Sequence, residues 1–371
     1  KGMLDRELRK IARATLPTVL SKCDPRALLD RWLKFDKSDV RNVPASQLIP
    51  KGGPKKVLGA FSDVPLIAAT AVDTELPSKE QMHWNWLDDE KLFIAAQCPS
   101  KDIYGLFFLS LVYADVRCIM QLTQNGEIVG DSPCDYFELK KYALPQMKVG
   151  NATVDVRVAE VEDKKSYAYR KVVITLKGDE SGKSGTYVLH HFHYHDWTDH
   201  DIPTERSDIF DVAFRVYKTV THIDERLLVH CRGGIGRTGA FLLVQMLLKL
   251  AFQKVELTTD IVYALAKSIR YRRHGAIQEP SQLAFALFIV AGVHLQAADA
   301  TRKDSLDVKE FSMKCDQVVS KESAKEDVER EKKAEAMAKR MEKKAAKLAK
   351  KEKEKAKAEK EMEKAAGGVG M

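Results

Sequence analysis

The chain has 371 residues, of which 44% are hydrophobic and 31% charged, and its formal net charge is +8. This composition predicts a sizeable folded core beside a highly charged remainder, which excludes a wholly disordered chain. The six cysteines show neither paired spacing nor a metal-ligand pattern with histidine, so a disulfide scaffold and a zinc site are both disfavoured and a reducing compartment fits.

The first part of the chain predicts helices followed by short strands. Residues 4–33 carry apolar side chains at helical intervals, interrupted by Pro17 and Pro25, which favours two short amphipathic helices. Aromatic and apolar residues then cluster in 83–87 and 93–98, as is typical of strands. Residues 106–122 predict a helix and then a strand.

Three later segments predict an antiparallel meander. They alternate or run apolar and are separated by turn-rich loops; they are residues 153–161, 167–176 and 186–193. The longest apolar run, 283–295, is too short to span a bilayer and predicts a core helix. The chain begins Lys-Gly-Met, without a signal peptide, which is consistent with a fragment of a soluble intracellular protein, expected in the cytoplasm or the nucleus.

A glycine-rich loop at 231–236 lies between a short apolar run, 227–229, and a stretch of helical length, 238–250. Backbone N–H groups in such a loop, together with the helix N-terminus, form a cradle for an oxyanion. The same groups stabilise a cysteine thiolate, the nucleophilic form, at Cys231. Arg237 can grip two phosphate oxygens with its planar fork, and Thr238 offers a hydroxyl to the sulfur as leaving group.

His230, Cys231, Arg237 and Thr238 together resemble the His-Cys-x5-Arg-Ser/Thr signature of the cysteine-based protein tyrosine phosphatases. The resemblance implies that the loop binds the phosphoryl oxygens and that His230 supports it. The substrate-binding residues implied within the loop are Arg232, Gly233, Gly234, Ile235 and Gly236. Arg232 directly after the nucleophile hints at another phosphomonoester, although a side chain that points to solvent is the simpler interpretation.

Residues 195–203 resemble the mobile Trp-Pro-Asp loop of this family, with Thr198 in place of proline and Asp201 in place of glycine. A closing lid can bring a proton donor to the leaving oxygen. The resemblance makes Asp199 the general acid and Trp197 a supporting residue. Asp201 could take the role only if the loop were shifted.

Residues 269–278 resemble the family segment whose arginines brace the signature loop and whose glutamine positions water. Arg270 and Arg273 match the bracing positions. A cysteinyl-phosphate is stable until water is aimed at phosphorus, so Gln278, with Gln282 nearby, is expected to orient that water.

Other family positions match less well. Glu127 and Cys134 fit the next family block, but Ser132 and Pro133 leave its lysine without a counterpart, and Val40 stands where a stacking tyrosine is expected. Cys98 replaces a family glycine; we interpret it as structural, with a redox partnership to Cys231 as the alternative.

The end of the chain changes character. Residues 322–364 are almost entirely Lys, Glu, Ala and Met, which favours a long solvated helix with Glu–Lys pairs. Apolar residues are too sparse for a sustained coiled-coil seam. The basic excess predicts at most weak attraction to nucleic acid or an acidic surface, because glutamates are interspersed.

We therefore expect an α/β fold, with a twisted mixed β-sheet flanked by α-helices, and a charged C-terminal tail. The expected parts are an N-terminal helical segment at 1–32, the phosphatase domain at 33–297 and a helical or disordered tail at 298–371. The resemblance implies hydrolysis of phosphotyrosine on proteins, with no metal or cofactor, because the arginine and loop amides neutralise the phosphoryl charge. The alternatives are a catalytically weak or dead module that binds phosphorylated partners, and an enzyme for another phosphomonoester.

Overall fold

The computed structural model describes residues 20, 22–37, 44–49, 56–61, 63–74, 76, 80–137, 143–178, 183–203, 206–223, 225–297 and 304–366. The chain divides into two compact units, Lys1–Ser320 and Lys321–Met371. The helix expected before residue 20, and Val40 with its neighbours, lie outside the described residues.

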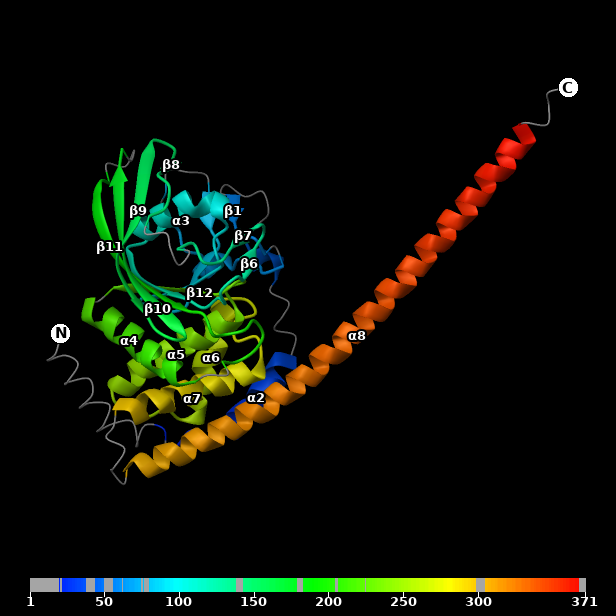
Figure 1. The fold of residues 1–371 in the computed structure, drawn as a ribbon. Coiled ribbons are helices and arrows are strands. Elements are labelled where there is room, and N and C mark those ends of the chain that lie inside the picture. The colour runs from blue at the N-terminus through cyan, green and yellow to red at the C-terminus, as the bar shows by residue number, and fades with distance from the viewer. Residues whose placement is uncertain are drawn as a thin grey trace. The chain divides into compact units, whose positions relative to one another are not determined.

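An eight-stranded mixed sheet is the centre of the first unit (Figure 1). Its four inner strands, β4, β12, β5 and β11, run parallel, and antiparallel strands extend it on both sides. In spatial order the strands are β3 (Trp84–Trp86), β4 (Phe93–Ala96), β12 (Arg226–His230), β5 (Val116–Gln121), β11 (Gly185–Tyr194), β10 (Tyr167–Lys177), β9 (Ala152–Asp163) and β8 (Met147–Val149).

Burial explains the sequence patterns of these strands. Leu227, Leu228 and Val229 of β12 are all fully buried, as expected for a central parallel strand covered on both faces. The predicted meander is confirmed as β9, β10 and β11, which pair antiparallel over most of their length. Two small sheets, outside the main one, complete the described strands: β1 (Lys56–Leu58) with β2 (Glu80–Met82), and β6 (Ile128–Val129) with β7 (Ser132–Pro133).

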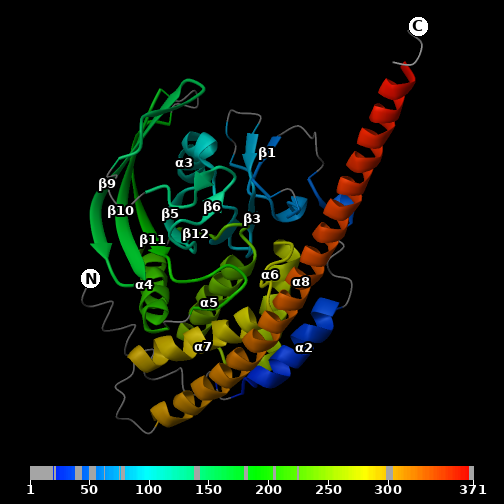
Figure 2. The ribbon, with the colours of Figure 1, turned by 45° about the vertical axis from the view of Figure 1, so that its right-hand side comes forward.

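Helices cover both faces of the sheet (Figure 2). The helix α3 (Tyr104–Tyr113) packs on one face against β5, β8 and β9. The other face is covered by a helical layer in which α4 and α5 contact the strands directly; its members are α2 (Pro25–Lys37), α4 (Ser207–Ile223), α5 (Gly236–Phe252), α6 (Thr259–Arg272) and α7 (Pro280–Ala297). The predicted fold class is confirmed.

The core helix expected at 283–295 is α7, and its described apolar side chains are largely buried against α4 and α5. Within the described part of the chain, no helix combines the length and the apolar character needed to cross a bilayer.

The last helix, α8 (Asp304–Ala366), begins earlier than the charged composition suggested. Phe311, Cys315 and Val319 recur at helical spacing and are buried in the core of the first unit. Arg206 also pairs with Asp316. From Lys321 onward α8 belongs to the second unit, where close charge pairs such as Lys333–Glu329 recur along the helix.

Candidate active site

The glycine-rich loop connects β12 to α5, in the expected order of strand, loop and helix. The helix begins at Gly236, two residues before the predicted start, so Arg237 and Thr238 lie in its first turn. Gly234 has φ of +70°, and a Cβ there would lie 2.0 Å from the carbonyl oxygen of Ala96. Only glycine fits this close approach to β4 without displacing the backbone.

Cys231 lies at the mouth of this loop and is 2% exposed. The backbone N–H of Gly234 donates to its sulfur at 3.3 Å. Behind it, His230 Nδ1 lies 3.1 Å from the Cys231 carbonyl oxygen, and Nε2 lies 3.2 Å from the Tyr136 hydroxyl. Burial lowers the pKa of His230 to about 4. The neutral ring therefore donates from Nδ1 and accepts at Nε2, which fixes the strand end that carries the cysteine.

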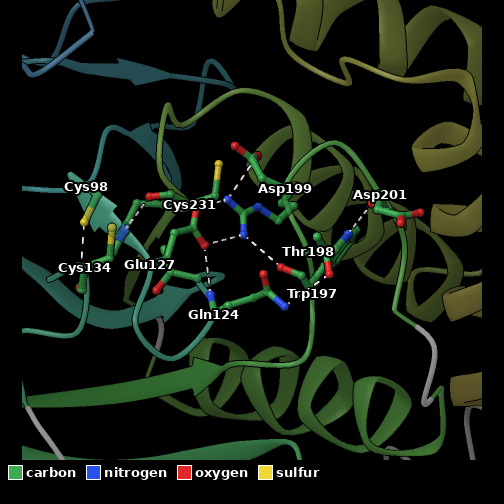
Figure 3. A network of polar contacts seen from close by, with 12 residues as sticks. Cys98, Gln124, Glu127, Cys134, Trp197, Thr198, Asp199, Asp201 and Cys231 are labelled. Carbon is green, nitrogen blue, oxygen red and sulfur yellow. Dashed lines mark hydrogen bonds and ion pairs between the residues drawn. The ribbon is translucent and has the colours of Figure 1, made fainter. Parts of the chain in front are cut away.

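Arg237 is fully buried. Three groups hold it, and Figure 3 labels the residues that carry them, Glu127, Trp197 and Asp199. Glu127 binds it in a fork, with Oε2 2.9 Å from NH1 and Oε1 2.6 Å from NH2. The carbonyl oxygen of Trp197 accepts from NH1 at 2.8 Å, and Asp199 Oδ1 lies 3.0 Å from NH2. Burial alone would lower the pKa of Arg237, but the Glu127 hydrogen bonds and the nearby charges of Cys231 and Asp199 raise it.

Glu127 is the site residue that sequence reasoning missed. The family block placed it correctly, yet gave it no role. The available signal was Arg237 itself, because a buried guanidinium requires a carboxylate partner to offset its desolvation.

The Trp-Thr-Asp loop brings Asp199, and not Asp201, to Arg237. The indole N–H of Trp197 donates to the Asp201 carbonyl oxygen at 2.6 Å, and its ring packs edge-on against Phe285. Asp201 Oδ1 accepts a hydrogen bond from the backbone N–H of Ile202 at 2.8 Å. Figure 3 shows the Asp201 carboxylate directed away from Cys231. Thr198, in the position of the family proline, accepts from Gln124 at 3.1 Å, which ties this loop to the segment that carries Glu127.

The two expected bracing arginines contact different segments, and only Arg273 binds the signature loop directly. Arg273 donates to the carbonyl oxygens of Gly234 at 2.9 Å and Gly233 at 3.2 Å. Asn85 and His83 hold its other end. Arg270 instead donates to the carbonyl oxygens of residues 276 and 277 at 2.5 Å each, and so supports the segment that leads to Gln278.

Gln278 and Gln282 lie against the loop. A Cβ at Gly236 would lie 3.0 Å from the side-chain oxygen of each glutamine. Gln282 Oε1 accepts the backbone N–H of Gln278 at 3.1 Å and that of Glu279 at 3.2 Å. Its amide nitrogen is thereby left for another partner.

Arg232 is exposed, and its guanidinium lies 5.3 Å from the centre of the Phe61 ring. Cys98 is buried, with its sulfur 3.7 Å from the carbonyl oxygens of Pro99 and Cys134. Burial raises the pKa of Cys98 well above its usual value. A buried neutral thiol that contacts backbone carbonyls favours the structural role over the redox one.

Three buried polar atoms at the loop have no hydrogen-bond partner within the described part of the chain. They are Arg237 Nε, Thr238 Oγ1 and Gln282 Nε2. Buried groups of this kind are costly unless they are paired. Two of them are N–H donors, so the arrangement suits a ligand rich in oxygen that enters beside the sulfur of Cys231.

Comparison with known proteins agrees with this chemistry. The sequence profile described as protein-tyrosine phosphatase matches residues 61–291. A relative, tyrosine-protein phosphatase non-receptor type 2 of Rattus norvegicus, is 30% identical over 219 residues, which cover 58% of this chain and 49% of the relative. The tyrosine phosphatase H3 of a Microplitis demolitor bracovirus is 24% identical over 60% of this chain and 68% of its own. The match therefore spans about half the length of the rat protein.

Among solved structures, a protein tyrosine phosphatase of Trypanosoma brucei aligns with a TM-score of 0.60 and 21% identity. The alignment covers 75% of this chain and 96% of the trypanosome chain. At this identity, the likeness supports the fold.

Proposed function

This chain belongs to the protein-tyrosine phosphatase family, and on that premise we propose that it hydrolyses phosphotyrosine on proteins through a cysteinyl-phosphate intermediate. One observation carries the proposal most directly: Arg237 Nε and Thr238 Oγ1, in the first turn of α5, and Gln282 Nε2, which lies against Gly236, are buried without protein partners within the described residues. A phosphoryl group beside the sulfur would supply oxygens to the two N–H donors, Arg237 Nε and Gln282 Nε2, and would leave Thr238 Oγ1 for the sulfur.

In the first step, the Cys231 thiolate forms a bond to phosphorus while the bond to the leaving oxygen breaks. Arg237 and the loop N–H groups hold the phosphoryl oxygens and neutralise the charge that they develop. Asp199, which leaves its ion pair with Arg237 and takes a proton from solvent as the phosphoryl group binds, gives that proton to the leaving oxygen. The Asp199–Arg237 ion pair, at 3.0 Å, supports this role, because Arg237 is the proposed phosphate-binding cation.

In the second step, water attacks phosphorus and the bond to Cys231 breaks, which releases inorganic phosphate and restores the thiolate. Asp199, now ionised, takes the proton of the water. Gln278 and Gln282 are the proposed orienting amides, since both lie against Gly236. Thr238 Oγ1 can donate to the departing sulfur. Because the arginine and amides neutralise the charge, the proposal requires no metal or cofactor.

The proposed partners are phosphotyrosine-containing proteins in the cytoplasm or the nucleus. All six cysteines are free and buried, which is consistent with a reducing compartment. The exposed Arg232 beside Phe61 could meet an acidic group that flanks the phosphotyrosine.

The test compares phosphate release from a phosphotyrosine peptide, a phosphoserine peptide of the same sequence and a short-chain phosphoinositide. We expect fastest turnover of the phosphotyrosine peptide and a loss of roughly a thousandfold or more in Cys231→Ser. Cys98→Gly, which restores the family residue, should stay active. A wild-type chain that binds the peptide without turnover would instead be a recognition module, and preferred turnover of another substrate would reassign the substrate class.

A further inference from the structure

The basic excess of the C-terminal helix lies in one block. Residues 339–351 contain seven Lys and Arg and one Glu. The preceding stretch, 321–338, has five basic and six acidic residues, and the following stretch, 352–364, has five of each. Acidic residues therefore balance the basic residues on both sides of the block, whereas the block itself is strongly basic.

Helix geometry gives residues 334–351 a basic face and an apolar face. At about 100° per residue, the basic positions share a sector of about 140°; they are Lys339, Arg340, Lys343, Lys344, Lys347, Lys350 and Lys351. Six of the nine apolar positions in 334–351 share a separate sector of about 100°, and three alanines lie outside it; the six are Ala334, Met337, Ala338, Met341, Ala345 and Leu348. Met337 and Met341 are 65% and 63% exposed.

We propose that residues 334–351 of α8 form a surface helix that binds the headgroup region of an anionic lipid bilayer. A basic amphipathic helix gains there from both faces at once, since its lysines meet acidic headgroups and its apolar side chains enter the boundary with the acyl chains. The proposed segment lies on the membrane and does not cross it, because its seven basic side chains are costly to bury in the hydrocarbon core.

Other binding partners would interact with only one of the two helix faces. A nucleic acid backbone would pair with the basic face but leave the two exposed methionines in water. A second copy of the helix would cover the apolar face, but it would bring two basic flanks together, and like charges there destabilise pairing. The opposed faces therefore favour the bilayer.

The experiment measures co-sedimentation of the full chain with vesicles of phosphatidylcholine alone and with about one-third phosphatidylserine. We expect binding only to the anionic vesicles, weakened by high salt. Neutralising four charges in the block (Lys339→Gln, Lys343→Gln, Lys344→Gln and Lys347→Gln) should weaken binding by at least about tenfold, since each basic residue contributes up to about fivefold. Met337→Gln with Met341→Gln should also weaken it.

A matched control neutralises four lysines outside the block, Lys353→Gln, Lys355→Gln, Lys357→Gln and Lys360→Gln, and should retain most of the binding. Helicity by circular dichroism and turnover of a small aryl phosphate verify that each variant is folded. Equal loss in the control, equal binding to neutral vesicles, or tighter binding to RNA or to an acidic protein than to anionic vesicles would each overturn the proposal. None of these outcomes depends on the catalytic proposal, because Cys231→Ser should bind vesicles as wild type does.

Discussion

Asp199 Oδ1 lies 3.0 Å from NH2 of Arg237, so the proposed proton donor and the proposed phosphate-binding cation form an ion pair. Glu127 binds the same guanidinium from the other side, at 2.6 Å and 2.9 Å. The two carboxylates differ in accessibility: the Glu127 side chain is 12% exposed and the Asp199 side chain 36%. We therefore expect Glu127 to be a fixed counter-charge and Asp199 to be the partner that an incoming phosphoryl group displaces.

Replacement of Asp199 tests which aspartate of the loop donates the proton. We expect Asp199→Ala to lower kcat for a phosphotyrosine peptide by roughly a hundredfold or more, because the tyrosine phenoxide must then leave unprotonated. Asp201→Ala is the matched control, and it should change kcat by less than about tenfold, since its carboxylate accepts from the N–H of Ile202 and is directed away from Cys231. Kinetics from about pH 5 to 8 give the comparison, and a larger loss in Asp201→Ala would reverse the assignment.

Removal of Glu127 should destabilise the fold, because it leaves Arg237 buried with a weaker counter-charge. We expect Glu127→Ala to cost up to about 3 kcal/mol in the free energy of unfolding. Added inorganic phosphate should raise the Tm of this variant more than that of wild type, since it supplies negative charge to Arg237. Glu162→Ala breaks a pair with Arg215 in which the carboxylate is 44% exposed, and this control should cost less than about 1 kcal/mol. A variant insensitive to phosphate would contradict the role given to Glu127.

Two neighbouring glycines of the loop should respond differently to alanine. Gly234 has φ of +70° and no room for a Cβ, whereas a Cβ at Gly233 would meet its nearest neighbour, Ile235, at 3.8 Å. We expect Gly234→Ala to destabilise the protein by at least about 2 kcal/mol and to abolish turnover. The free energy of unfolding of Gly233→Ala should lie within about 1 kcal/mol of the wild-type value. Denaturant unfolding of both variants provides the measurement, and equal stability would show that the loop relaxes around Gly234.

Acidification should destabilise the protein through its buried histidines. Burial, then the charge of Arg170, lowers the pKa of His193 from 6.5 to about 3, and burial lowers that of His230 to about 4. Between those values and 6.5 the unfolded chain binds protons that the folded chain does not, so stability falls as pH falls. The slope is about 1.4 kcal/mol per pH unit for each histidine.

Unfolding free energies of wild type and His193→Asn between pH 7 and 5 check this effect. The unfolding free energy of the variant should fall less steeply as pH falls, by about the slope that one histidine contributes. An unaltered slope in His193→Asn would mean that this ring titrates normally in the folded protein.

Local sequence determined much of this molecule, because the features concerned depend on near neighbours in the chain. The alternation of β9 to β11, the apolar run of β12 and the glycine pattern after Cys231 each predict their own local structure. The spacing of Cys231 and Arg237 likewise places both at one loop, whatever the rest of the chain does. The charged composition of α8 predicts a helix for the same reason.

Tertiary structure alone decided the relationships between distant segments. Glu127 and Arg237 are 110 positions apart, and nothing in either neighbourhood specifies their fork. Asp199 contacts Arg237 from a loop on another segment of the chain, and the need for glycine at 234 depends on the nearness of the Ala96 carbonyl on β4. Such contacts form when separate elements of the fold pack together. Local sequence patterns do not specify which elements meet.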